Sequence, residues 1–223
     1  NLISFNKHNS FNKIPKIIMD LKDMKSIALV SDAGMPSICD PGEDLVKEAR
    51  SNEINIVCIP GPCAAITALV SSGLPSSKFT FEGFLPKKQS ERGKILLEIS
   101  RNEKTSIIFE SPHRLIKLLY ELKEYCGGDR QIRVSRELTK KFEQHIGDNI
   151  YEVINFFNDR EVLGEITVVI EGRNKSKNNT PSDNFQIKRD LNDLTTAGLS
   201  LSAASKYLAK KNNIPKSIIY NMY

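Results

Sequence analysis

Short apolar runs and polar loops alternate along the first third of the chain. The apolar positions of residues 14–21 recur with a helical period, whereas "SIALV" (26–30) and "INIVCI" (54–59) are short continuous runs typical of buried strands. A loop of glycine, proline and polar residues follows each run, and the helical stretches 43–50 and 64–72 follow the loops. This repeat of strand, loop and helix predicts a parallel sheet covered by helices, with ligands at the carboxyl ends of its strands.

The middle of the chain has a different pattern. Prolines, glycines and three phenylalanines interrupt the periodicity over 72–94, where we expect a domain boundary. The motif "ESPHRL" begins a predicted helix with Ser111 as N-cap and Pro112 at the first position. Further helices are predicted at 94–102 and 150–157, and strands at 105–109, 131–138 and 164–172. The pattern therefore predicts a second α/β domain without strict alternation of strands and helices.

The last 49 residues differ in composition from the rest. Residues 173–184 contain no large apolar side chain, which predicts a flexible linker. Three short helices are expected beyond it, with Ala203, Ala204, Tyr207 and Leu208 on one face of the second. The expected organisation is an N-terminal α/β domain (1–78), a second α/β domain (79–174), a linker (175–184) and a basic helical module (185–223).

The charge distribution adds a candidate partner. The whole net charge of +5 lies in residues 175–223, which hold eight basic and three acidic side chains. Such asymmetry favours contact with a polyanion, although a solvated charged face explains it nearly as well. With 39% hydrophobic residues and no apolar run near the ~18 residues of a membrane span, we expect a cytoplasmic protein without membrane contact.

The cysteines and histidines predict no metal site. Four cysteines and three histidines show no paired spacing of the kind that zinc sites use. We expect free thiols in a reducing compartment, with Cys58 buried inside its apolar run.

Three polar loops follow expected strands, at 31–42, 60–64 and 110–114, and we expect them to converge on one ligand site. Their glycines let a ligand approach the backbone, and Asp32 is suited to accept hydrogen bonds from ribose hydroxyls or an ammonium group. The alternative is that Ser31 and Asp32 only cap turns. The chain has neither a GxxxxGK[ST] phosphate loop nor a GxGxxG fingerprint after a strand, which argues against nucleotide hydrolysis and Rossmann-type dinucleotide binding.

Six ordered motifs carry a family resemblance. They are "LVSDAGMPSICDPG", "IPGPCAAITALVSSGLP", "FEGFLPKK" with Arg92 soon after, "FESPHRL", "SRELTKKFEQ" and "GEITVVIEG". In this order they resemble the ribosomal RNA small subunit methyltransferase I family, within the larger tetrapyrrole methylase class. The resemblance implies two α/β domains with S-adenosylmethionine in the cleft between them, a homodimer, and methylation of a cytidine ribose 2′-hydroxyl in the decoding region of 16S ribosomal RNA.

The resemblance also implies the site residues. Those expected to bind the cofactor are Ser31, Asp32, Ala33, Gly34, Ile38, Pro60, Gly61, Pro62, Ala64, Glu110, Ser111, Leu138, Ile166 and Thr167. A general base or a cationic neighbour would assist the ribose hydroxyl. The candidates, at polar strand ends of the second domain, are Glu110, Arg136, Glu137 and Lys140, each with an alternative reading as an ordinary ion pair or helix cap.

For the RNA or the small ribosomal subunit we expect phosphate contacts from lysines and one arginine. These residues are Lys87, Lys88, Arg92, Lys206, Lys210 and Lys211. Phe81 or Phe84 would stack on a base, with buried packing as the alternative.

Two other functions stay open. A small-molecule, tetrapyrrole-like methylase would share the cofactor loops without needing a basic tail, and a non-catalytic RNA-binding module would need no cofactor. The resemblance further implies a strand and a glycine loop before the first motif. The sequence contains no such segment, so we expect it to be missing ahead of Asn1.

Overall fold

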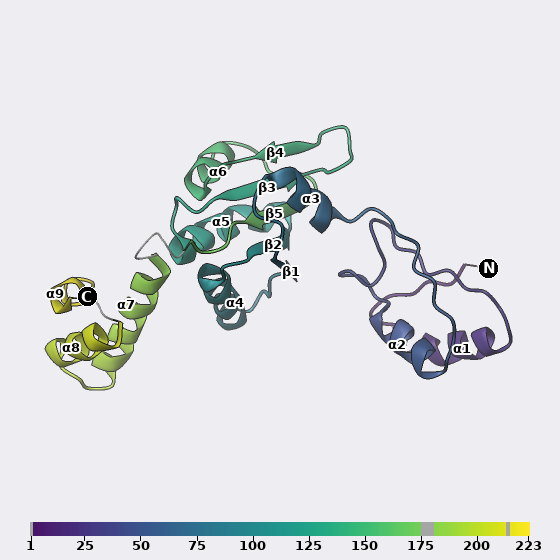
Figure 1. Ribbon diagram of the computed structural model, residues 1–223, viewed down its shortest axis with the longest axis horizontal. Coiled ribbons are helices and arrows are strands. Elements are labelled where there is room, and N and C mark those ends of the chain that lie inside the picture. The colour runs from purple at the N-terminus through teal and green to yellow at the C-terminus, as the bar shows by residue number, and fades with distance from the viewer. Residues whose placement is uncertain (1, 175–180, 213–214) are drawn as a thin grey trace. The chain divides into compact units, whose positions relative to one another are not determined.

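A computed structural model describes residues 2–174, 181–212 and 215–223 of the chain. The chain divides into two compact units, Asn1–Thr67 and Ala68–Tyr223, called the first and second unit below. Figure 1 shows the elements of both units. The expected boundaries at residues 78 and 174 stay predictions.

The first unit is built on two amphipathic helices. These are α1 (Ser10–Lys22) and α2 (Glu43–Ser51), and a third helix, α3 (Ala64–Ser72), begins at the end of the unit. Ile17 and Ile18 of α1 pack with Leu45 and Ala49 of α2 in a small apolar core. Glu43 and Asp44 occupy the first turn of α2, where the positive end of the helix dipole favours carboxylates.

The two strands expected in the first unit do not form. Residues 26–30 and 54–59 belong to no strand, because an extended segment becomes one only when its backbone groups bond to a neighbour, and no strand is described in residues 2–67. Apolar residues in these segments, such as Val30 and Ile59, are consequently exposed. Cys58 is exposed as well, so the prediction that it is buried is wrong.

The second unit contains a five-stranded sheet. Its strands are β1 (Phe79–Phe84), β2 (Thr105–Glu110), β3 (Ile132–Arg136), β4 (Gln144–Ile146) and β5 (Ile166–Ile170), and their order is β1-β2-β5-β3-β4 (Figure 1). β1 and β2 are parallel, whereas β5 runs antiparallel to both β2 and β3, and β4 antiparallel to β3. The expected strands at 105–109, 131–138 and 164–172 are confirmed, and β1 and β4 are additions to the prediction.

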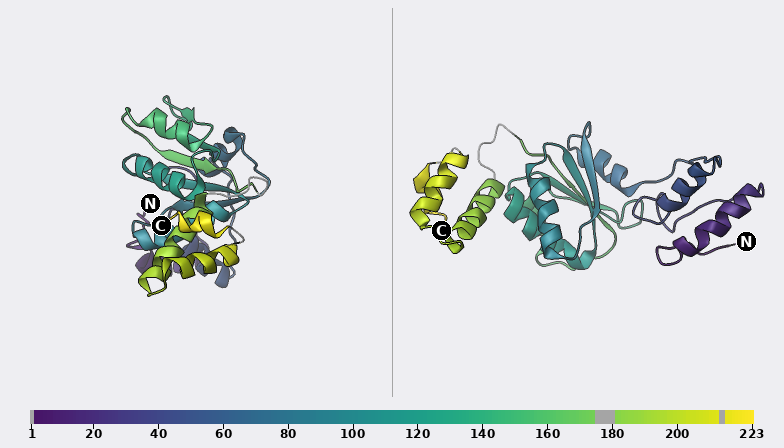
Figure 2. Two further views of the ribbon diagram at one scale, coloured as in Figure 1. Left: turned by 90° about the vertical axis from the view of Figure 1, so that its left-hand side faces the viewer. Right: turned by 90° about the horizontal axis from the view of Figure 1, so that it is seen from below.

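Three helices supply side chains to the core of the second unit. They are α4 (Gln89–Arg101), α5 (Pro112–Cys126) and α6 (Ile150–Phe157). Alternate residues of the central strands, including Ile108, Val134 and Val168, join Leu118 of α5 in this core. The right view of Figure 2 shows helices beside the strands. Cys126 lies in the same core, and burial raises the pKa of its thiol to about 11.

The C-terminal residues form three helices as expected, α7 (Pro181–Thr196), α8 (Leu201–Asn212) and α9 (Lys216–Tyr220). Ile187, Leu191, Ala204, Leu208 and Ile219 make their common core. α7 begins inside the stretch expected as a linker, and residues 175–180 of that stretch lie outside the described residues.

Only part of the face expected on α8 is buried. Ala203 and Tyr207 are exposed, and Ala204, Ser205 and Leu208 face the core, because one turn of a helix buries only about a third of its circumference. In the part of the chain that the structure describes, none of the helices combines the length and apolar character that crossing a bilayer requires.

The core of the second unit makes a direct prediction. Leu118 is fully buried between the helices and the sheet, so Leu118→Ala leaves a cavity and is expected to lower the free energy of unfolding by about 2–5 kcal/mol. Urea denaturation measures this difference. Leu163→Ala, at a position that is more than half exposed, is the matched control, and equal losses from both variants would contradict the described core.

Candidate functional site

Two predicted cofactor loops meet within the first unit. A side chain placed on Gly34 would lie 3.6 Å from the carbonyl oxygen of Pro62, and one placed on Gly61 would lie 3.8 Å from Met35. The loop 31–38 therefore lies against the loop 60–64. These two loops carry the first-unit residues predicted to bind the cofactor, which are Ser31, Asp32, Ala33, Gly34, Ile38, Pro60, Gly61, Pro62 and Ala64.

The first of these loops has an unusual backbone. Gly34, Ser37 and Cys39 all have left-handed conformations, with φ of 74°, 70° and 66°, which cost energy for residues that carry a Cβ. The Ser31 hydroxyl donates to the carbonyl oxygens of Ala33 (3.3 Å) and Gly34 (3.0 Å), which closes the turn. Strained non-glycine residues of this kind cluster at ligand sites. Ser31 is thus a turn-forming residue here, and this does not prevent a ligand contact.

The second-unit candidates lie along one edge of the sheet. Glu110 at the end of β2 pairs with Ile166 at the start of β5, and Ile166 pairs with Arg136 at the end of β3. Thr167 is the next residue of β5, and Ser111 directly follows Glu110. Antiparallel β5 therefore brings its first residues to the edge where β2 and β3 end. The sequence motifs around Glu110, Arg136 and Ile166, far apart in the chain, are neighbours.

The loop after β3 holds the remaining candidates in a strained turn. Glu137 and Thr139 have left-handed backbones, with φ of 52° and 65°. The Glu137 carboxylate accepts from the backbone N–H of Glu165 (3.0 Å) and from Lys140 (3.0 Å), and Lys140 also contacts Glu165 at 3.3 Å. The Glu165 N–H and then the Lys140 ammonium lower the pKa of Glu137. Glu137 and Lys140 thus brace the loop that carries Leu138.

A buried ion network lies beside the same edge. The Arg92 side chain is 2% exposed, and its Nε donates to the Glu121 carboxylate at 2.6 Å. Its terminal nitrogens lie 3.4 Å from Oε2 of Glu110, whose other oxygen is 3.3 Å from Arg114. Arg114 donates in turn to the Leu85 carbonyl oxygen at 2.7 Å. The network joins α4, α5, the end of β2 and the segment after β1.

This network bears on two predictions, that of Arg92 as a phosphate contact and that of Glu110 as a general base. Arg92 lacks the exposed guanidinium that a phosphate contact requires, because both of its carboxylate partners are buried with it. Glu110 is a poor general base, because its carboxylate is fully buried and shared between Arg92, Arg114 and the Ser111 N–H at 2.9 Å. Glu110 and Arg114 are only four residues apart in the sequence, whereas Glu121 lay too far along the chain to be foreseen.

Among the catalytic candidates, Arg136 has a buried hydrogen-bond donor without a partner in the described residues. Among the described residues, no group accepts a hydrogen bond from its buried Nε. A buried donor without a partner costs free energy, and a ligand oxygen would remove that cost.

Sequence reasoning missed a chain of hydrogen bonds beside Arg136. Ser135 lies 2.9 Å from Nδ1 of His145, whose Nε2 lies 3.0 Å from Glu143. Ser135 is fully buried, so it orients the ring of His145 and is not positioned as a nucleophile. The pairing of Ser135 with His145 depends on the β3–β4 register, which the sequence alone did not reveal.

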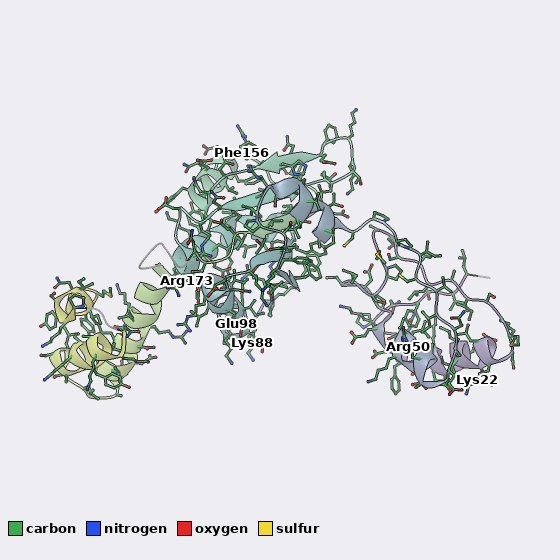
Figure 3. All side chains as sticks on the ribbon, viewed as in Figure 1. Lys22, Arg50, Lys88, Glu98, Phe156 and Arg173 are labelled. Atoms are coloured by element: carbon green, nitrogen blue, oxygen red, sulfur yellow. The ribbon has the colours of Figure 1, made fainter. Side chains whose placement is uncertain are left out.

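The other residues predicted to bind RNA are exposed. Lys87 and Lys88 precede α4, and Lys88, labelled in Figure 3, contacts Glu91 at 2.9 Å. Lys206, Lys210 and Lys211 lie on the exposed side of α8, and Lys211 contacts Asp190 at 3.2 Å. Surface ion pairs of this kind are weak and are readily exchanged for a phosphate.

Comparisons with known proteins agree with the motifs. Residues 6–154 match the family described as Tetrapyrrole (Corrin/Porphyrin) Methylases. The chain is 38% identical over 221 residues to the ribosomal RNA small subunit methyltransferase I of Synechocystis sp., a match that covers 99% of the chain and 78% of that protein. It is 41% identical over 220 residues to the protein of the same name from Buchnera aphidicola, covering 98% of the chain and 74% of that protein.

Solved structures show the same fold at low identity. The crystal structure of the methyltransferase CobJ matches with a TM-score of 0.55 and 17% identity, over 72% of this chain and 70% of that one. Diphthine synthase matches with a TM-score of 0.50 and 15% identity, over 74% of this chain and 65% of that one.

The buried ion network yields a prediction. Arg92→Met leaves Glu110 and Glu121 without their main cation, so it is expected to lower the free energy of unfolding by about 3–5 kcal/mol in urea denaturation. Lys88→Met removes only an exposed pair with Glu91 and should cost less than about 1 kcal/mol. Similar small losses from both variants would show that Arg92 does not neutralise the two carboxylates.

Proposed function

We propose a methyl acceptor for this chain from the family to which it belongs. The chain is a member of the tetrapyrrole methylase family and, within it, of the ribosomal RNA small subunit methyltransferase I proteins. The proposed acceptor is the ribose 2′-hydroxyl of a cytidine in the decoding region of 16S ribosomal RNA. The protein is a methyltransferase, and its methyl donor is S-adenosylmethionine. The observation that carries the proposal is an identity of 38–41% over nearly the whole chain to relatives of that name.

The first-unit loops suit the donor. Asp32 offers an exposed carboxylate for ribose hydroxyls, and Ile38 offers an exposed apolar surface for the adenine ring. The strained turn around Gly34 leaves backbone groups accessible between them, since the neighbouring residues are exposed too. We propose that these loops hold the nucleoside of S-adenosylmethionine. Cofactor contacts from Ser111, Leu138, Ile166 and Thr167 of the second unit stay a prediction of the family resemblance.

The main task of the protein in methyl transfer is to align the acceptor hydroxyl with the methyl group. S-adenosylmethionine supplies an already activated methyl group, so the protein must place the hydroxyl oxygen in line with it. We propose that Arg136 donates a hydrogen bond to that oxygen and stabilises the charge that develops on it as its proton passes to solvent water. Glu137 and Lys140 hold the loop next to Arg136, and Glu110 fixes the end of β2 through Arg92 and Arg114.

The basic C-terminal helices favour RNA over a small molecule as the acceptor. Lys206, Lys210 and Lys211 are exposed on α8, and phosphate contacts of this kind position a nucleic acid without reading its sequence. A small-molecule methylase has no use for them. We also propose that the protein acts as a homodimer in the cytoplasm, where ribosomal RNA is available.

Arg136 provides a test of the catalytic assignment. Arg136→Ala is expected to lower kcat for methyl transfer to small ribosomal subunits about 10²-fold or more, because the developing charge loses a preorganised donor. The dissociation constant for S-adenosylmethionine, measured by calorimetry, should change little. Arg136→Lys should recover part of the rate, and an unchanged kcat in Arg136→Ala would remove Arg136 from the mechanism.

Removal of the basic module tests the acceptor. A variant lacking residues 185–223 is expected to bind S-adenosylmethionine normally in calorimetry and to lose most transfer of labelled methyl groups to small subunits, because its phosphate contacts are gone. Transfer to naked 16S RNA, measured beside it, separates the two forms of substrate, and mass spectrometry of nuclease digests locates the methylated nucleotide.

Each rival function has its own outcome in this experiment. A calorimetric signal for S-adenosylmethionine without any methyl transfer to small subunits or 16S RNA by the wild-type protein would support a small-molecule acceptor. Undiminished transfer to small subunits after the deletion would overturn the proposed role of the basic module. RNA binding without any calorimetric signal for S-adenosylmethionine would support a non-catalytic module. A methyl group on a base, or outside the decoding region, would overturn the proposed acceptor.

A further inference from the structure

Three aromatic side chains are exposed on the edge strand of the sheet. Phe79, Phe81 and Phe84 of β1 are 39%, 37% and 57% exposed, and they form what is called the aromatic face below. Phenylalanine is usually buried in a domain core, so three exposed rings on one six-residue strand indicate a binding surface.

A β-bulge puts all three rings on the same side of the sheet. Phe81 pairs with Ile107 and Gly83 with Ile108, so Glu82 is an extra residue in β1. In a regular strand Phe81 and Phe84 would point to opposite sides, because side chains alternate. Gly83 accommodates the bulge with a left-handed φ of 61°. The bulge therefore places all three phenylalanine rings on one side of the sheet.

Two of the rings are held from the side by a ring of the neighbouring strand. Phe109 of β2 contacts Phe81 edge-on at 5.0 Å between ring centroids and Phe84 at 5.7 Å. Edge-to-face packing fixes the orientation of a ring and leaves part of its surface free. A preordered aromatic surface loses little side-chain entropy when a ligand binds.

The aromatic face lies near the end of the sheet where Glu110, Arg136 and Thr167 are located. Phe84 pairs with Phe109, and Phe109 pairs with Thr167, so all three residues belong to one cross-strand row. Two strand spacings, about 10 Å, separate Phe84 from Thr167, one of the proposed cofactor residues. A nucleotide stacked on Phe84 would therefore be a near neighbour of the reacting one.

Positive charge flanks the strand. Lys78 precedes β1, and Lys87 and Lys88 follow it closely, and all three are exposed. Exposed aromatic rings between basic side chains are the arrangement that binds single-stranded nucleic acid, since rings stack on bases and ammonium groups contact phosphates. A second copy of this chain, with its own lysines at the same places, is repelled by these charges.

We propose that the aromatic face binds unpaired bases of the RNA that flank the nucleotide to be methylated. The inference rests on the proposed function for the identity of the RNA. Phe81 and Phe84 stack on bases, and Lys78, Lys87 and Lys88 contact the phosphates that join them. The buried Arg92, which was expected to share this role, instead holds α4 in place behind the lysines.

The absence of tryptophan from the sequence gives a direct test. Phe81→Trp and Phe84→Trp each introduce a single indole on the aromatic face. Titration with oligocytidylate is expected to quench tryptophan fluorescence, because a base stacked on the ring quenches it. Phe11→Trp, at an exposed position of α1 in the first unit, is the matched control and should show no quenching.

Affinity provides the second measurement. Phe81→Leu and Phe84→Leu keep an apolar side chain but lose the stacking surface, and each should weaken binding of fluorescein-labelled oligocytidylate about 5-fold or more by fluorescence anisotropy. Phe11→Leu should bind as wild type does. Lys87→Gln should reduce the slope of log affinity against log salt concentration by about 0.7, the share of one phosphate contact.

The possible outcomes separate this inference from the proposed function. Wild-type affinity in both leucine variants, or unquenched fluorescence in both tryptophan variants, overturns the aromatic face as an RNA site. So does a leucine variant that changes the sedimentation coefficient while binding RNA normally, since the face would then join two copies of the chain. If RNA binding depends on the phenylalanines but wild-type protein methylates no small subunit, the proposed function alone fails.

Discussion

The pairing of Arg92 with two buried carboxylates is the constraint on which the arrangement of the second unit depends. Charges this deep are tolerated only when each has a partner, so α4, α5 and the end of β2 must keep fixed positions relative to one another. Glu110 ends its strand inside this network, and Ser111 begins the next segment from there. The position of the strand end that carries the candidate site residues therefore depends on electrostatics as much as on apolar packing.

The register of the sheet brings the other candidate site residues next to Glu110. The chain between Glu110 and Ile166 is long, but pairing to β5 makes these residues neighbours and brings Arg136 beside them. β5 lies between β2 and β3 and runs antiparallel to both. The start of β5 and the loop before it therefore lie beside the ends of β2 and β3. The braced turn of Glu137 and Lys140 then limits how Arg136 moves.

Much of the fold was predictable, for identifiable reasons. The helices α5 and α6 and the strands β2, β3 and β5 follow from local periodicity and helix capping, and the three helices at the C-terminus also formed as expected. The strands expected at 26–30 and 54–59 failed, because a strand needs a neighbour and sequence periodicity does not supply one. β1 was hidden by its own bulge, since Gly83 disturbs the alternation by which a strand is recognised. The motifs located the loops of the site, but which charges are buried, as with Arg92, depends on packing between segments far apart in the sequence.

The position of β1 at the border of the sheet has a further consequence. One side of this strand carries backbone N–H and C=O groups that no strand of the described sheet pairs with, and an apolar border of this kind is prone to adhere to the same border of another molecule. Lys78 at one end and Lys87 and Lys88 at the other hinder such adhesion, because docking would bring like charges together. The same lysines thus help to keep the free protein from aggregating in the period before it meets its RNA.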